Sequence, residues 1–112
     1  MPGDGLYEKL TALRAAGAVR LDDDETEALS VALAGVSGEV WLFGSRVGSG
    51  RRRGDIDIMV LTREPAFETS QKVATRFFSS CEEKVDVAVF DPDWVTAEQA
   101  ELLFRADRIR LA

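Results

Sequence analysis

Two closely spaced aspartates constrain this chain more than any other feature. The stretch from Trp41 to Val60 contains an apolar run, a glycine-serine turn, a basic loop and then alternating aspartates and isoleucines. Because side chains alternate between the two faces of a strand, Asp55 and Asp57 would project from one face and the isoleucines from the other. Two carboxylates one pleat apart repel each other unless a cation or a proton intervenes. Oxygen ligands at this separation suit a divalent metal, above all Mg²⁺.

A third carboxylate and a glycine turn accompany this pair. Residues 84–90 alternate valines with other side chains, so Asp86 projects from the face opposite the valines, where an unpaired charge would be costly. Gly44-Ser45 ends an apolar strand, and backbone N–H groups that open onto a helical turn can bind phosphate oxygens. A glycine at 44 also lets the main chain approach a phosphate without a Cβ in the way.

Together these groups suit the transfer of a phosphoryl or nucleotidyl group. Two carboxylates with phosphate oxygens can hold two metal ions in the arrangement that such transfer requires. A third carboxylate can help to hold the second ion and draw the proton from an attacking hydroxyl. Each motif taken alone is common, and the combination carries the functional interpretation.

The apolar pattern predicts four helices and four strands. Strands are expected at 39–43, 56–61, 84–90 and 109–111, the last at a sheet edge, and helices at 6–17, from 22 to 35 or 38, at 66–80 and at 96–104. The chain has 112 residues, of which 46% are hydrophobic, which suits one domain with a small two-layer core. We therefore expect an α+β (α/β) fold, a mixed β-sheet flanked by helices, over residues 1–112.

Two patterns that look functional are interpreted as structural. In the acidic run at 22–25, Asp22 can cap a helix with Glu25 three residues later, and acidic side chains favour the first turn of a helix. A stripe of apolar residues at helical spacing is expected in the core: Phe67, Val73, Ala74, Phe77 and Phe78. Cys81 is expected to be a small buried or boundary residue.

Composition excludes several classes of function. The chain has no histidine, which removes Ser-His-Asp and Cys-His mechanisms and the usual zinc sites, and its one cysteine cannot form an intrachain disulfide. The net charge of −6 argues against strong non-specific binding of nucleic acid. Neither a basic leader with an apolar stretch nor a run of membrane-spanning length is present, so we expect a cytoplasmic protein.

The combined motifs resemble the nucleotidyltransferase superfamily, which includes DNA polymerase beta, and most closely its minimal nucleotidyltransferase (MNT) family of small prokaryotic proteins. The matching segments are Gly44-Ser45-Arg46-Val47, Gly54-Asp55-Ile56-Asp57 and Lys84-Val85-Asp86. The resemblance implies a nucleotidyltransferase fold, with Asp55, Asp57 and Asp86 as catalytic, metal-binding carboxylates around two Mg²⁺ ions. It implies nucleotide-phosphate contacts from Gly44 and Ser45. It leaves two roles open for Arg46, which would contact the nucleotide or fix the turn.

The resemblance also implies an activity and a partner. We expect Mg²⁺-dependent transfer of a nucleoside monophosphate, AMP from ATP, to a hydroxyl of a protein acceptor. MNT proteins are often antitoxins paired with a HEPN-family ribonuclease toxin, which they silence by adding AMP. The alternative is a catalytically weak or inactive module that binds a nucleotide or the toxin and neutralises its partner by binding. A third interpretation is an acidic structural domain in which the carboxylates coincide by chance.

Three further features of the sequence bear on the site and on assembly. Many relatives carry a serine directly before the first metal aspartate, where this chain has Gly54. Arg51 to Arg53 would draw in ATP or a pyrophosphate leaving group, or form a solvated basic loop. The terminal strand at 109–111 leaves a sheet edge to which a second copy of the chain could pair, giving a homo-oligomer.

Overall fold

The helices and strands follow one another along the chain in the order that the apolar pattern predicts. The computed structural model describes residues 5–48, 54–105 and 107–112. The elements are α1 (Leu6–Ala15), α2 (Asp23–Ala32), β1 (Glu39–Phe43), the 3₁₀ helix η1 (Gly44–Arg46), β2 (Ile56–Leu61), α3 (Ala66–Phe78), β3 (Val85–Phe90), α4 (Ala97–Arg105) and β4 (Arg108–Arg110). The expected α+β fold, a mixed sheet flanked by helices, is confirmed.

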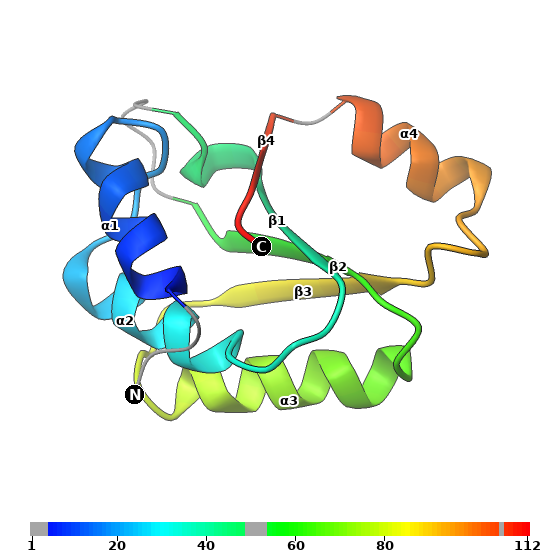
Figure 1. Ribbon diagram of the computed structural model, residues 1–112, viewed down its shortest axis with the longest axis horizontal. Helices are drawn as coiled ribbons and strands as arrows, with labels where there is room; N and C mark the ends of the chain where they lie inside the picture. The colour runs from blue at the N-terminus through cyan, green and yellow to red at the C-terminus, as the bar shows by residue number, and fades with distance from the viewer. Residues whose placement is uncertain (1–4, 49–53, 106) are drawn as a thin grey trace.

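The four strands form one sheet in the order β3–β2–β1–β4. β1 runs antiparallel to both of its neighbours, β2 and β4, whereas β2 and β3 run parallel and are joined through α3. Parallel strands need such a crossover connection, which a helix usually supplies. Because β2 and β3 run in the same direction, their first residues lie at the same end of the sheet, together with the end of β1 (Figure 1).

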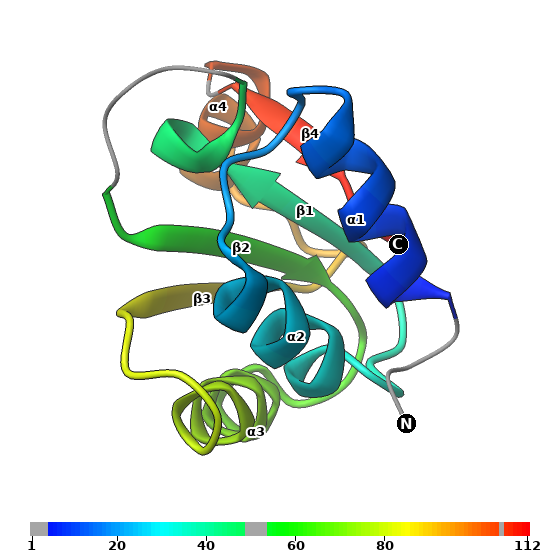
Figure 2. The ribbon, with the colours of Figure 1, turned by 90° about the vertical axis from the view of Figure 1, so that its left-hand side faces the viewer.

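The helices are distributed unequally over the sheet. α1, α2 and α3 pack on one side, and α4 lies on the other (Figures 1 and 2). The main core lies under the first three helices and includes Leu10, Leu29, Val40, Leu42, Ile56, Ile58, Val60, Val73 and Phe77. A smaller cluster of Phe43, Met59 and Phe90 lies on the opposite face. The second face is therefore the more thinly covered of the two.

Helix α3 corrects part of the predicted core. Val73 and Phe77 are fully buried, but Phe67 and Phe78 are 74% and 55% exposed. Residues 67 and 78 are about three helical turns apart and so lie on nearly the same side of the helix, the outer one. The helix flanks the sheet at β3 and packs through one side only, so the apolar pattern overstated the width of its buried stripe.

The structural interpretation of the acidic run is confirmed. The Asp22 side chain accepts the Glu25 backbone N–H at 2.7 Å, and the Glu25 side chain accepts the Asp22 N–H at 2.9 Å, which completes a capping box at the start of α2. Cys81 is buried, as expected. In the described part of the chain, no helix is both long and apolar enough to cross a membrane.

Candidate active site

Asp57 and Asp86 lie side by side on the same face of the sheet. They are direct partners in the parallel pairing of β2 with β3. Neighbouring strands are about 4.8 Å apart, so two side chains in this register reach the same volume of space. Their face is that of the smaller cluster, because Met59 follows Asp57 by two residues along β2. The sequence prediction required Asp86 to lie on this side of the sheet, and it does.

Asp55 stands at the entrance of the same site, one residue before β2. The Ile56 backbone N–H donates to the Lys84 carbonyl oxygen at 3.1 Å, which carries the parallel pairing back to the level of Asp55 and Lys84. The Lys84 Nζ lies 3.5 Å from Asp55 Oδ2. All three predicted carboxylates thus gather at one end of two adjacent strands, with a lysine beside the outermost.

The charges of Asp55 and Asp86 act on the carboxyl group of Asp57. Burial raises the pKa of Asp57, and the negative charges of Asp86 and Asp55 raise it further, against a smaller opposing effect of Lys84. A raised pKa means that the ionised carboxylate is disfavoured where it stands. The negative charges of the site therefore outweigh the positive charge of Lys84, which is the condition in which a bound cation stabilises it.

The residues fit a hard divalent cation by their chemistry. Asp57 and Asp86 offer carboxylate oxygens, the ligands that Mg²⁺ prefers, and waters and substrate phosphates usually complete its octahedron. Among the residues that the structure describes, no three acidic, histidine or cysteine side chains are already arranged around a common point. Asp55 pairs with Lys84 instead, so its carboxylate would need to turn toward the other two.

Gly44 fits the turn for two reasons. Its φ of +71° lies in the left-handed region, and a Cβ at this position would come within 3.1 Å of Asp57 Oδ2. The turn continues directly into η1, as the sequence predicted for a phosphate-binding turn. However, the Gly44 N–H already donates to the Asp107 carbonyl oxygen at 3.0 Å. The N–H groups of Ser45 and Arg46 are therefore better placed than that of Gly44 to bind a phosphate.

Gly54 lies close to the side chain of Ser45. The side chain of Ser45 is exposed at the turn, and a Cβ at position 54 would come 2.6 Å from its Oγ. The two positions lie on either side of the loop between β1 and β2, so a side chain at position 54 would require the Ser45 hydroxyl to turn aside.

Arg46 fixes the turn, which is one of the two roles left open for it. Its guanidinium is buried and forms a two-point ion pair with Glu25, at 2.8 Å from Nη1 to Oε1 and 2.9 Å from Nη2 to Oε2. Its Nε donates to the Gly54 carbonyl at 2.8 Å and Nη1 to the Arg20 carbonyl at 3.0 Å. The side chain thereby ties both sides of the β1–β2 loop to α2 and to the segment before it.

The capping residue Glu25 has a second role that sequence reasoning missed. Burial acts to raise the pKa of Glu25, but the hydrogen bonds from Arg46 and from the Asp22 backbone, together with the positive charge of Arg46, outweigh it and lower the pKa. Glu25 is therefore ionised at neutral pH although it is buried. The acidic run at 22–25 contained the partner of the turn's arginine, but no local pattern links residues this far apart.

Residues 18–20 also hold the turn in place, through backbone hydrogen bonds. They pair with residues 46–48 through the Val19–Val47 bridge, with hydrogen bonds of 2.7 Å from the Arg20 N–H to the Arg46 carbonyl and from the Gly48 N–H to the Ala18 carbonyl. The Arg20 side chain also donates to the Ser45 carbonyl at 3.0 Å. The turn is thus held on both sides, which gives the site a rigid edge.

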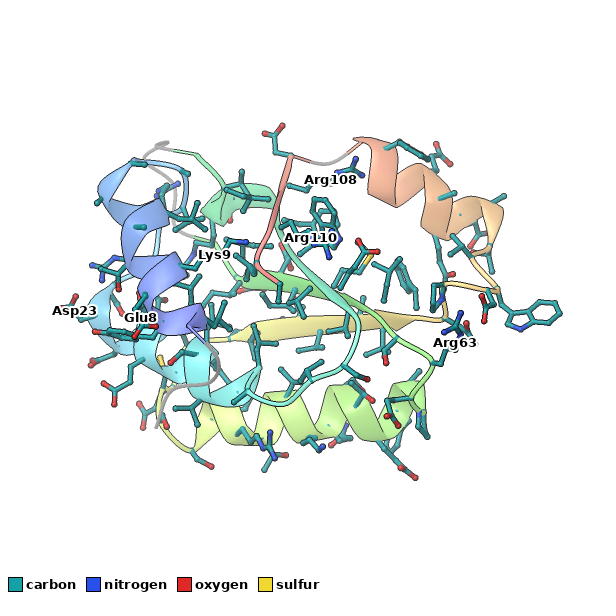
Figure 3. The ribbon with its side chains drawn as sticks, in the orientation of Figure 1. Glu8, Lys9, Asp23, Arg63, Arg108 and Arg110 are labelled. Atoms are coloured by element: carbon teal, nitrogen blue, oxygen red, sulfur yellow. The ribbon has the colours of Figure 1, made fainter. Side chains whose placement is uncertain are left out.

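A cavity of about 440 Å³ opens beside the carboxylates. Its lining is mostly apolar, with acidic groups at one end: Phe43, Gly44, Asp57, Ile58, Met59, Asp86, Val87 and Ala88. Farther along the same face, the Arg108 guanidinium stacks over Trp41 at 5.1 Å and over Phe104 at 5.7 Å from the ring centres. Figure 3 shows Arg108 between β4 and α4. The face thus joins an apolar floor to a cluster of acidic oxygens.

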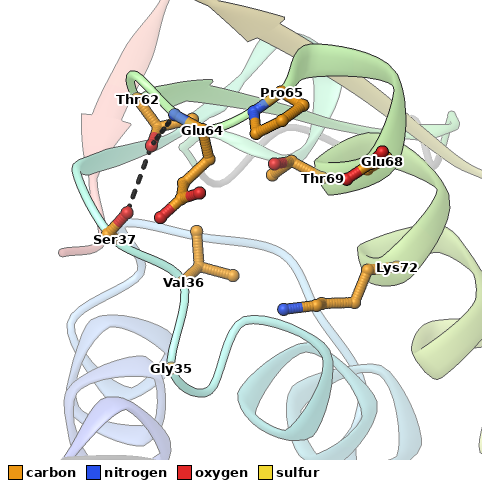
Figure 4. A pocket seen from close by; sticks show the side chains of 9 residues that line it. All are labelled: Gly35, Val36, Ser37, Thr62, Glu64, Pro65, Glu68, Thr69 and Lys72. Carbon is orange, nitrogen blue, oxygen red and sulfur yellow. Dashed lines mark hydrogen bonds between the residues drawn. The ribbon is translucent and has the colours of Figure 1, made fainter.

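A second cavity, of about 190 Å³, lies elsewhere, and its acidic side chains, Glu64 and Glu68, line it together with Lys72 (Figure 4). It is lined in part by Ser37 and Thr62, whose hydroxyls are 3.2 Å apart, and the Thr62 hydroxyl also accepts the Glu64 N–H at 3.1 Å. Thr62 follows the last residue of β2, whereas Asp57 is near its first. The two cavities therefore lie at opposite ends of the strand, and only the first contains the predicted site residues.

The remaining site prediction, Arg51 to Arg53, lies outside the described residues. In comparisons with known proteins, no protein-family model matches the chain and no curated protein matches it. The case for function therefore depends on the residues and their geometry.

Proposed function

We propose that this protein is a Mg²⁺-dependent nucleotidyltransferase that transfers AMP from ATP to a hydroxyl of a protein acceptor. The observation that carries the proposal is the pairing of Asp57 with Asp86 on one face of adjacent parallel strands, beside the Gly44 turn. The raised pKa of Asp57 adds a physical reason for a cation to bind there.

In this mechanism each group of the chain has a separate task. The N–H groups of Ser45 and Arg46 bind phosphate oxygens of the donor, and the apolar floor formed by Phe43 and Met59 contacts its less polar part. The three carboxylates would hold the cations, which would supply positive charge to stabilise the transition state and the leaving pyrophosphate. Asp86 accepts the proton of the acceptor hydroxyl as its oxygen bonds to the α-phosphorus and the bond to the bridging oxygen breaks.

The acceptor we propose is a HEPN-family toxin, and the protein would then be its antitoxin, acting in the cytoplasm. The resemblance of the three motif segments to MNT proteins supports this partner. We also propose that the edge of β4 is available for pairing with a second copy, because it is the outer strand of the sheet on that side.

Transfer of radioactive label from α-labelled ATP to a co-purified HEPN partner tests the activity. We expect Mg²⁺-dependent labelling that Asp57→Asn and Asp86→Asn each reduce by at least about a hundredfold, since each removes a metal ligand or the base. Asp24→Asn makes the same chemical change at an exposed position in the first turn of α2 and should label normally. Equal labelling by all four proteins would refute the proposal.

One observation favours a second candidate, a module that neutralises its partner by binding alone. Asp55 is paired with Lys84, and the described acidic groups do not already surround a metal position. If this candidate is correct, the Asp57→Asn/Asp86→Asn double variant will protect cells from the toxin as well as the unmodified protein does. If the enzyme is required, the double variant will bind the toxin but fail to protect.

A further inference from the structure

Lys84 is the part of the site to which sequence reasoning gave no role. It directly precedes β3, and its backbone carbonyl is fixed by the Ile56 N–H. Its Nζ lies 3.5 Å from Asp55 Oδ2, and its positive charge also acts on Asp57. Lys84 therefore lies at the end of the sheet where the three carboxylates gather, and its charge would influence any cation that binds them.

The ion pair of Lys84 with Asp55 is of the kind that exchanges readily. The two side chains are 67% and 48% exposed. Exposed pairs of this type contribute little net stability, because water competes for both charges. The lysine side chain is a flexible stem with three donors at its end, so its ammonium can move to a new acceptor at low cost.

A divalent cation at the carboxylates changes the balance of charge around Lys84. A cation there would attract Asp55 and repel the ammonium, which would leave the flexible lysine free to move to another anion. In a site that accepts a nucleoside triphosphate, the phosphate tail is the anion nearest to the metal. Lysine serves as a point-charge ligand of phosphates in many nucleotide sites.

We propose that Lys84 has two alternative partners: it holds Asp55 in the metal-free protein, and it binds a phosphate oxygen of the donor once a divalent cation occupies the carboxylates. The inference depends on the proposed function, and it assigns the order of events: the metal displaces the lysine, and the displaced lysine favours donors with a phosphate tail. Lys84 is thus a phosphate-binding residue that also restrains premature metal binding.

Two binding measurements test this role without any measurement of transfer. The first is the affinity for Mn²⁺ alone, followed by the loss of the free-ion paramagnetic resonance signal. Because removal of a nearby like charge favours a cation, Lys84→Gln should bind Mn²⁺ about three- to tenfold more tightly than the unmodified protein. Lys9→Gln, on the exposed face of α1 (Figure 3), loses the same charge elsewhere and should not differ.

The second measurement is the affinity for the manganese complex of inorganic tripolyphosphate, which carries the phosphate chain without a base or sugar. Lys84→Gln should bind this complex about three- to tenfold more weakly, and Lys84→Arg should restore most of the affinity. Opposite signs in the two measurements distinguish the proposed exchange from a general loss of structure, which would weaken both.

Each contrary result has a distinct meaning. An unchanged Mn²⁺ affinity in Lys84→Gln overturns the competition for Asp55, and an unchanged tripolyphosphate affinity overturns the phosphate contact. If Asp57→Asn abolishes Mn²⁺ binding while Lys84→Gln behaves as the unmodified protein in both measurements, the role of Lys84 fails and the proposed function stands. If Asp57→Asn leaves Mn²⁺ binding intact, the proposed function fails, and the inference fails with it.

Discussion

Glu25→Gln tests whether the buried ion pair with Arg46 holds the glycine turn in place. Both side chains are almost completely shielded from water, at 0% and 1% exposure, and they meet through two charged hydrogen bonds. Glutamine has nearly the same shape as glutamate but no charge. The substitution therefore leaves the Arg46 guanidinium buried without its counter-ion, while the packing around it is almost unchanged.

The expected loss of stability can be estimated from these contacts. Removal of one partner of a buried ion pair costs about 3–5 kcal/mol, because the remaining charge is uncompensated. The Arg46 side chain keeps its hydrogen bonds to the carbonyls of Gly54 and Arg20, and the glutamine oxygen still accepts one. We therefore expect a loss near the lower end, about 3 kcal/mol. A domain of this size typically has about 5–15 kcal/mol in total, so the variant should remain folded in dilute buffer.

Urea unfolding at neutral pH, followed by tryptophan fluorescence and circular dichroism, measures this loss. Asp23→Asn is the matched control, because Asp23 also lies in the first turn of α2 and pairs with Arg14, but its side chain is 95% exposed. Its loss should be several-fold smaller than that of Glu25→Gln. If the two variants unfold at the same urea concentration, the buried pair does not hold the turn and the reasoning is wrong.

The pH dependence of the same pair gives a second measurement. The pKa of Glu25 in the folded protein is lower than the ordinary value of 4.5. Its contribution to stability is therefore complete above that value and is lost as the pH falls through the lower folded pKa. The difference in unfolding free energy between the unmodified protein and Glu25→Gln should shrink on acidification below about pH 4.5. A difference that stays constant would contradict this assignment.

Three further predictions concern the site and the core. Asp57→Asn should raise the free energy of unfolding at neutral pH in the absence of metal. The pKa of Asp57 is raised in the folded protein, so the unmodified protein loses stability as the pH rises from 3.8 through the higher folded pKa. Urea unfolding of this variant beside Asp24→Asn checks the sign. Gly44→Ala should destabilise the turn by about 1 kcal/mol or more and weaken tripolyphosphate binding, measured by calorimetry, since φ is +71° and the new Cβ meets Asp57. Phe77→Ala should cost about 3–5 kcal/mol, whereas Phe78→Ala, at the exposed side of α3, should change the urea midpoint little.

Local patterns were sufficient for most of the elements. The apolar run that ends at Gly44-Ser45 and the alternation that begins at Asp55 place β1 and β2 at the observed residues, because both patterns are properties of neighbouring side chains. The Asp22 capping box was equally visible, since its two partners are three residues apart. The width of the buried side of α3 was not, because it depends on where the helix sits at the flank of the sheet.

The site was predictable only in part, for a related reason. The alternation showed that Asp55 and Asp57 share a face, but whether Asp86 joins them depends on the parallel register of β2 and β3. Arg46 was ambiguous because a basic residue in a glycine turn looks the same whether it points to solvent or to the interior. Only the fold brings Glu25 to it, and that contact removes its side chain from the surface.

The contrast between the two sets of charges at the glycine turn is the strongest physical argument for a ligand. On the inner side, the guanidinium of Arg46 is matched by Glu25 and by backbone carbonyls. On the outer side, Asp57 is pushed toward its protonated form by burial and by two neighbouring carboxylates. Packing requirements account for the first arrangement, because a buried charge needs its partner. They do not account for the second, since an asparagine at position 57 would fill the same space without the repulsion. A carboxylate kept at a cost to stability supports our proposal that a divalent cation binds at this corner, together with the phosphates of a nucleotide.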